Sequence, residues 1–239
     1  MLRPTMWVFP LVASIIALAF AALLVRQFAS RRRPFQATWA AALLMFSAAS
    51  FAMFLGVLSG WTTAEYRTYW LFGASLNVPF LAMGEGYLLI RRKRVADVAL
   101  IVLLFLAGFA TSQVRTAPIN TAALSADLPL GKDVFGSGSL AYRLAQLYAY
   151  PAYILLVAGC GWSAWQMRGK PELLDRFIGT LGIAVGATIV AIGSGVGAGF
   201  DIVPLFSIGL AAGIAVMFWG FLRASRQRSP RPASLPTPS

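Results

Sequence analysis

Two residue types that are absent or nearly absent from the sequence limit the reactions that this protein can catalyse. Its 239 residues include no histidine, and Cys160 is the only cysteine. Without histidine, the chain has no histidine general base, no histidine metal ligand and no histidine pH switch. A single cysteine excludes an intramolecular disulfide and a cysteine-based metal site. The apolar segments hold no paired acids and no nucleophile–base spacing. We therefore predict no enzyme, no metal and no cofactor.

One apolar segment carries a polar stripe that predicts a binding site. Arg143, Gln146, Tyr150 and Tyr153 are spaced at i, i+3, i+7 and i+10, which places them on one face of a helix. A charged stripe in an apolar helix normally faces a cavity or other helices. The stripe predicts the wall of an externally open pocket, in which Arg143 recognises an anionic or carbonyl group. In the alternative interpretation, Arg143 extends to the membrane interface and the tyrosines belong to an aromatic belt.

A second stripe lies in an earlier apolar segment, where Trp70, Gly73, Asn77 and Gly84 share one helical face. Asn77 falls near the middle of the segment and needs a hydrogen-bonding partner there. Pro79 removes a backbone donor two residues later and favours a kink. Trp70 and Asn77 are therefore further candidates for ligand binding. The alternative is that Asn77 only joins neighbouring helices.

Glu85 is the only acidic residue well inside an apolar segment. From the helical rise it lies about 7 Å from the end of that segment at Ile90. A buried carboxylate at this depth is a candidate proton or ion site. The alternative is structural pairing with Arg91, Arg92 or Arg26.

Glycines at helical spacing recur in the last two apolar segments. A nucleotide-binding loop is a poor interpretation of them, since no strand precedes them and no lysine follows. Small residues four apart let membrane helices approach closely, inside the bundle or between subunits. Asp201, between these segments, is expected to cap the following helix, with pairing to Arg143 as the alternative. The packing glycines are Gly182, Gly186, Gly193, Gly197, Gly209 and Gly213.

These residues must be positioned by membrane-spanning helices. The chain is 59% apolar and only 12% charged, whereas about a quarter of the residues of a soluble domain are charged. Backbone groups inside a bilayer must bond within their own segment, which favours helices. We predict an all-α integral membrane protein with a seven-transmembrane helix bundle over residues 1–223. The seven expected spans are about 7–28, 35–59, 67–90, 95–113, 141–165, 177–198 and 204–222.

The basic residues predict how the bundle is oriented. Most of the 20 lysines and arginines fall on alternate connections, including residues 31–33 and 91–94, and in the tail. The positive-inside rule then places the N-terminus outside and the C-terminus in the cytoplasm of a plasma-membrane, multi-pass protein. The competing interpretation is a cleaved signal peptide with an Ala-x-Ala site at 17–19, which would invert every later loop. The net charge of +12 lies in short loops beside the spans, so we expect no nucleic-acid partner.

Two segments lie outside the expected spans. Residues 114–139 form the only long connection, with a short helix expected around 120–126, and loops of this length are often functional or mobile. The tail, residues 224–239, is rich in Arg, Pro and Ser and is expected to be disordered in the cytoplasm. A retinal protein is excluded by the lysines, because Lys93, Lys132 and Lys170 all lie outside the spans.

Three stretches resemble the seven-helix membrane sensor region at the N-terminus of certain bacterial sensor histidine kinases. They read "LLVRQFASRRRPFQATWAAALLMFSAASFAMFLG" at 23–56, "YWLFGASLNVPFLAMGEGYLL" at 69–89 and "FDIVPLFSIGLAAGIAVMFWGFLR" at 200–223. The signalling domain that follows the last helix in those proteins is absent from this sequence. The resemblance implies a bundle that signals through a partner and transfers no ligand-binding residue.

The favoured function is a receptor-like or sensor bundle that binds a small molecule, a lipid, a partner membrane protein or a second copy of itself. The alternative is a small solute transporter or channel with a three-plus-one-plus-three helix layout. It is suggested by the similarity of "GASLNVPF" at 73–80 to "GAGFDIVPL" at 197–205, because paired broken helices often mark a transport site. An intramembrane enzyme is the third and least favoured function.

Overall fold

The structure is a computed structural model that describes residues 7–199 and 203–226. Within these ranges every regular element is helical, which confirms the all-α class. Six helices are long and apolar enough to cross a bilayer. They are α1 (Val8–Arg31), α2 (Pro34–Ser59), α5 (Lys93–Thr116), α7 (Leu140–Met167), α8 (Leu174–Gly199) and α9 (Val203–Arg226).

The segment predicted at 67–90 is helical but changes type along its length. It consists of α3 (Thr63–Thr68), a π-helix η2 (Tyr69–Leu76) and α4 (Asn77–Leu89), with no break between them. Pro79 has no N–H to offer the carbonyl of Ser75, and its ring crowds that carbonyl. The wider π turns end just before this point, and the Ser75 hydroxyl donates to the carbonyl of Trp70 at 3.2 Å. The segment in which we expected a kink therefore contains a π-helix.

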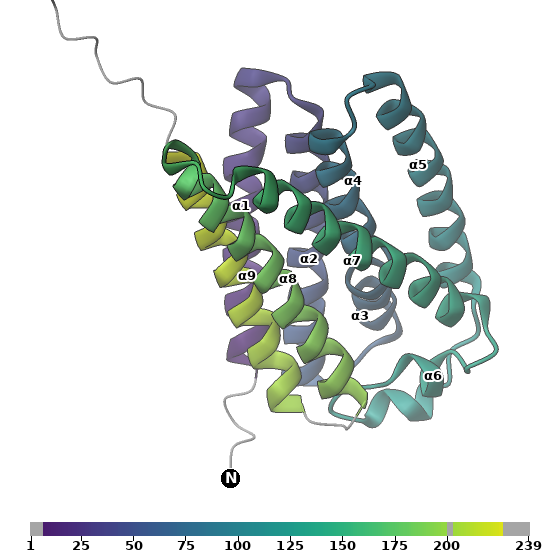
Figure 1. Ribbon diagram of the computed structural model, residues 1–239. Helices are drawn as coiled ribbons and strands as arrows, with labels where there is room; N and C mark the ends of the chain where they lie inside the picture. Colours follow the sequence, from purple (N-terminus) through teal and green to yellow (C-terminus); the bar gives the residue numbers. More distant parts are fainter. Residues whose placement is uncertain (1–6, 200–202, 227–239) are drawn as a thin grey trace, which may run out of the picture.

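The helices form one bundle in which α1, α2, α4, α7, α8 and α9 surround a shared core (Figure 1). α9 packs against α8 and α1, α2 packs against α1 and α4, and α7 packs against α4 and α8. α5 stands at the edge and buries only Ala96, Ala110 and Val114. Most of the apolar surface of α5 is therefore free to face lipid.

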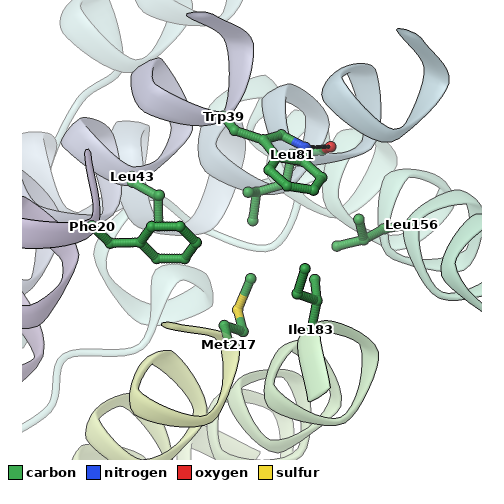
Figure 2. A pocket seen from close by; sticks show the side chains of 7 residues that line it. All are labelled: Phe20, Trp39, Leu43, Leu81, Leu156, Ile183 and Met217. Atoms are coloured by element: carbon green, nitrogen blue, oxygen red, sulfur yellow. Dashed lines mark hydrogen bonds between the residues drawn. The ribbon is translucent and has the colours of Figure 1, made fainter. Parts of the chain in front are cut away.

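Side chains from six helices meet at the centre of the bundle (Figure 2). The Trp39 indole N–H donates to the carbonyl of Leu81 at 2.9 Å and so joins α2 to α4. The remaining space there is about 10 Å³, enough for at most one water. This core is closely packed by Phe20, Trp39, Leu43, Leu81, Leu156, Ile183 and Met217.

The glycines of α8 and α9 lie at the contact between these two helices. A Cβ on Gly193 would lie 3.0 Å from the Cα of Gly209, and one on Gly182 would lie 3.0 Å from the Cα of Gly220. Gly186 and Gly213 meet in the same way. These glycines therefore pack within one chain. The side-chain surroundings of Gly197 and the position of Asp201 lie outside the described residues, as does the tail beyond Arg226.

One end of the bundle carries a folded cap, which we define as residues 117–139. It contains η3 (Thr121–Ser125), where a short helix was expected, and α6 (Gly131–Val134). The Tyr66 hydroxyl donates to the carbonyl of Pro129 at 3.2 Å. The guanidinium of Arg67 donates to the carbonyls that end α5, including Ala117 at 2.9 Å. The opposite end, where α1 meets α2, α4 meets α5 and α7 meets α8, is called the basic end (Figure 1).

Candidate functional site

The structure separates the residues of the predicted stripe on α7. Arg143 is exposed, and its Nε donates to the carbonyl of Ser137 at 3.5 Å. Gln146 is half-buried and donates to the hydroxyl of Tyr142, one turn earlier on the same helix, at 3.0 Å. Both side chains are thus engaged within the cap and α7 itself.

The two tyrosines of the stripe also point to different surroundings. Tyr150 is 64% exposed on the surface of α7. The Tyr153 hydroxyl donates to the hydroxyl of Thr188 at 3.1 Å, which joins α7 to α8. These contacts suit an interfacial or inter-helical role at least as well as ligand binding.

Trp70 and Asn77 lie inside the bundle. The Trp70 indole N–H donates to the carbonyl of Ala141 at 3.0 Å, and its ring stacks on Tyr142 at 6.0 Å between centroids. Asn77 is 5% exposed, and its Oδ1 has no hydrogen-bond partner among the described residues. None of the six predicted ligand residues lines the small space at the bundle centre or the cavity at the basic end. A ligand role for them stays a prediction.

Aromatic side chains and the cap fill the capped end of the bundle. The ring of Trp70 lies against Gly131 so closely that no Cβ would fit there. Trp61 donates from its indole N–H to the carbonyl of Asp127 at 3.3 Å. Phe135 packs against both Tyr66 and Trp70, with centroids 5.7 Å apart in each case. The externally open pocket expected beside Arg143 stays a prediction.

A cavity of about 790 Å³ opens instead at the basic end. Its walls come from α1, α2, α4, α7, α8, α9 and the connection after α4. This volume is in the range of sites that take small molecules. Its polar lining consists of charged, amide and hydroxyl side chains, which include Gln27, Glu85, Arg91, Ser163, Gln166 and Arg176.

Glu85 is the most buried of these charged groups, at 3% exposure. The Ser163 hydroxyl donates to its Oε1 at 3.0 Å. Gly159 faces it on α7, where a Cβ would lie 2.7 Å from the Glu85 Cγ, so the missing side chain makes room for the carboxylate. Within the described residues no arginine or lysine forms an ion pair with Glu85. The predicted pairing with Arg91, Arg92 or Arg26 is therefore absent.

Two arginines at the cavity mouth also lack acidic partners. Arg91 and Arg176 are exposed, and no ion pair of either occurs in the part of the chain that the structure describes. Arg223 differs, because it pairs with Asp175 at 3.3 Å and stacks over Trp219 at 5.6 Å. The mouth therefore presents two cationic groups that are free to bind an anion.

The cavity also borders the lipid-facing surface. Leu88 on α4 and Trp162 on α7 both line it, and they are 50% and 53% exposed. Trp162 lies on a helix that is long and apolar enough to cross a bilayer, where an exposed apolar side chain faces lipid. Leu88 and Trp162 therefore give the cavity an apolar rim.

The polar pattern on the second half of α7 is the signal that could have located this site. Gly159, Ser163 and Gln166 are spaced at i, i+4 and i+7, which places them on one helical face. Ser163 and Gln166 line the cavity, and Gly159 opens space beside it for Glu85. Reasoning from the sequence concentrated on the charged first half of α7 and missed this stripe.

No protein-family model matches the chain, and neither the curated proteins nor the solved structures contain a significant match. The helices of this chain define a polytopic, all-helical membrane protein.

Proposed function

We propose that this protein is a seven-helix, receptor-like membrane protein that binds an amphiphilic small molecule or lipid in the cavity at its basic end. The observation that carries the proposal is a cavity of about 790 Å³ that combines a buried carboxylate, two unpaired arginines and an apolar rim formed by Leu88 and Trp162. Polar groups fix the orientation of a ligand, and apolar walls supply most of its affinity.

The seventh span in this proposal is the run from Thr63 to Leu89. Its helical segments follow one another without a break, and at 1.5 Å per residue they extend about 40 Å, enough to cross the hydrocarbon core. With seven spans, the basic connections at residues 31–33 and 91–94 lie on one side with the end of α9. The N-terminus is then outside, and the cavity opens toward the cytoplasm.

Cys160 supplies a direct test, since it lines the cavity, is 1% exposed and is the only cysteine. The reconstituted protein is stripped of lipid, treated with N-ethylmaleimide and followed by intact-mass spectrometry, with and without added membrane lipid. Because Cys160 is almost fully buried, we expect its thiol to react slowly, by way of the cavity, and added lipid to slow the reaction further.

The matched control moves the thiol to the lipid-facing surface of the same helix. Ala158 is exposed and lies outside the cavity lining, so the combined change Cys160→Ala and Ala158→Cys places the thiol two residues away. Lipid should not protect position 158 in the way it protects position 160. Equal reaction rates at both positions, unaffected by lipid, would contradict the proposal.

The second candidate function is transport of a small solute. It is favoured by a cavity that opens at the basic end while aromatic side chains and the cap fill the other end, an arrangement that suits one state of an alternating-access cycle. The π-helix η2 and Pro151 within α7 add two irregular helices near the closed end. Solute accumulation in proteoliposomes would favour transport, whereas saturable binding without flux would favour the receptor-like function.

A further inference from the structure

Resting on the binding function proposed above, we infer which headgroup the cavity selects. The geometry points to a zwitterionic amine–phosphate headgroup of the aminophospholipid type. Its primary ammonium binds Glu85 and Ser163, and its phosphate binds Arg91 and Arg176. The acyl chain leaves between Leu88 and Trp162.

The ammonium site follows from the incomplete surroundings of Glu85. An ionised carboxylate offers about four acceptor positions, and the Ser163 hydroxyl is its only side-chain donor among the described residues. A charge buried among membrane helices is stable only with a partner of opposite charge or with several hydrogen bonds. A primary ammonium carries one positive charge and three donors, so it supplies both to the carboxylate and can also donate to the Ser163 hydroxyl.

The phosphate site follows from the two arginines at the mouth. Guanidinium groups match phosphate in geometry and charge, and Arg91 and Arg176 reach the cavity from two different elements. Glu85 lies about one helical turn before the end of α4 at Leu89, and Arg91 lies two residues beyond that end. The two groups form no ion pair with each other. A molecule with opposite charges at its two ends can bridge this separation and neutralise both.

The apolar rim at Leu88 and Trp162 favours a headgroup that arrives on a lipid over a free solute. Leu88 and Trp162 line the cavity and are half-exposed on the outer faces of α4 and α7. An acyl chain that passes between them stays in contact with apolar surface along its length, and burial stabilises it by about 0.8 kcal/mol per methylene. A soluble headgroup lacks this contribution.

The test compares three probes that share their acyl chains: dihexanoyl phosphatidylethanolamine, phosphatidylcholine and phosphatidylglycerol. Binding to the delipidated protein is followed by intrinsic tryptophan fluorescence, because Trp39 and Trp162 both line the cavity. The ethanolamine probe should bind about ten- to a hundredfold more tightly than the glycerol probe, which has no ammonium group. The choline probe should fall below the ethanolamine probe, since its quaternary nitrogen has no N–H donor.

Variants assign the two ends of the headgroup. Glu85→Gln keeps the side-chain shape and should bring the ethanolamine probe to the affinity of the glycerol probe, which itself changes little. Combined Arg91→Gln and Arg176→Gln should weaken all three probes. Both arginines are exposed, so this variant should fold normally, and an unchanged melting temperature of Glu85→Gln checks the buried position. Phosphoethanolamine without acyl chains should bind far more weakly, which distinguishes a lipid from a free headgroup.

Three results would overturn the inference. Equal affinity for all three probes, unaffected by Glu85→Gln, would remove the ammonium site while leaving the cavity as a binding site. Equal affinity of phosphoethanolamine and its dihexanoyl lipid would remove the lipid source. Failure of every probe to bind would overturn the inference, and persistence of lipid protection at Cys160 would then show whether the proposed function survives.

Discussion

A single methyl group on α7 tests the packing that holds Glu85 in place. A Cβ on Gly159 would lie 2.7 Å from the Cγ of Glu85 and 2.9 Å from the Cδ1 of Leu89, closer than real Cβ atoms come to their neighbours. Gly161 lies two residues later on the same helix, and a Cβ there would have nothing within 4 Å. Gly159→Ala and Gly161→Ala are therefore the same substitution in a crowded and an open environment.

The expected difference in stability follows from the free-energy contributions that the two variants do not share. Alanine is favoured over glycine in a helix interior by about 1 kcal/mol, and both variants gain this. Only Gly159→Ala forces a methyl group into packed side chains, which costs about 1–3 kcal/mol. At about 2–4 °C per kcal/mol for a chain of this size, the two melting temperatures should differ by roughly 2–12 °C, with Gly159→Ala lower.

The assay is thermal unfolding of both variants in one detergent, followed by tryptophan fluorescence. The same samples are then titrated with the ethanolamine probe, because a displaced Glu85 side chain should bind the ammonium group less well. Gly161→Ala should melt at or above the temperature of the unchanged protein and bind normally. Equal melting temperatures and equal affinities for the two variants would refute the contact between α4 and α7 described here.

Three further predictions test the packing that surrounds the site. Gly186→Ala should lower the free energy of unfolding by about 1–3 kcal/mol relative to Gly195→Ala, because only the first variant adds a methyl group where α8 meets α9. Equal stability of the two variants in chemical denaturation would refute this. Arg67→Lys should loosen the end of α5 by about 1–3 kcal/mol through lost hydrogen bonds, seen as faster amide exchange there; unchanged exchange would speak against it. Trp70→Phe should cost more than the roughly 1 kcal/mol of the bond to Ala141, because the smaller ring also leaves space where the indole packs on Gly131; an unaltered melting temperature would contradict that role.

The long apolar helices could be predicted from the sequence because hydropathy and helix ends are local signals. The run predicted at 35–59 corresponds to α2, which begins with Pro34 in its first turn and ends at Gly60, whose φ of 91° favours glycine. The expected short helix in the long connection corresponds to η3. Each of these features depends on neighbouring residues alone.

The π-helix and the cavity could not be predicted, because both depend on how distant helices pack. Residues 69–76 have the same apolar character in an α-helix and in a π-helix. The Glu85 side chain fits against α7 because that helix, which crosses the bundle obliquely (Figure 1), presents Gly159 to it, and hydropathy carries no information about tilt. The pocket predicted from the stripe that begins at Arg143 stays a prediction, and at that end of the bundle Trp70 and Phe135 pack closely against the cap.

The measurement that tests the central claim most directly is native mass spectrometry of the gently solubilised protein and two variants. Ser163→Trp places a large side chain beside Glu85 in the cavity at the basic end, and Arg143→Ala removes the charge from the exposed stripe near the cap. We predict that the unchanged protein and Arg143→Ala each retain one lipid per chain and that folded Ser163→Trp, checked by its melting temperature, retains none. Loss of the lipid in Arg143→Ala with retention in Ser163→Trp would place the site at the other end of the bundle and contradict the account.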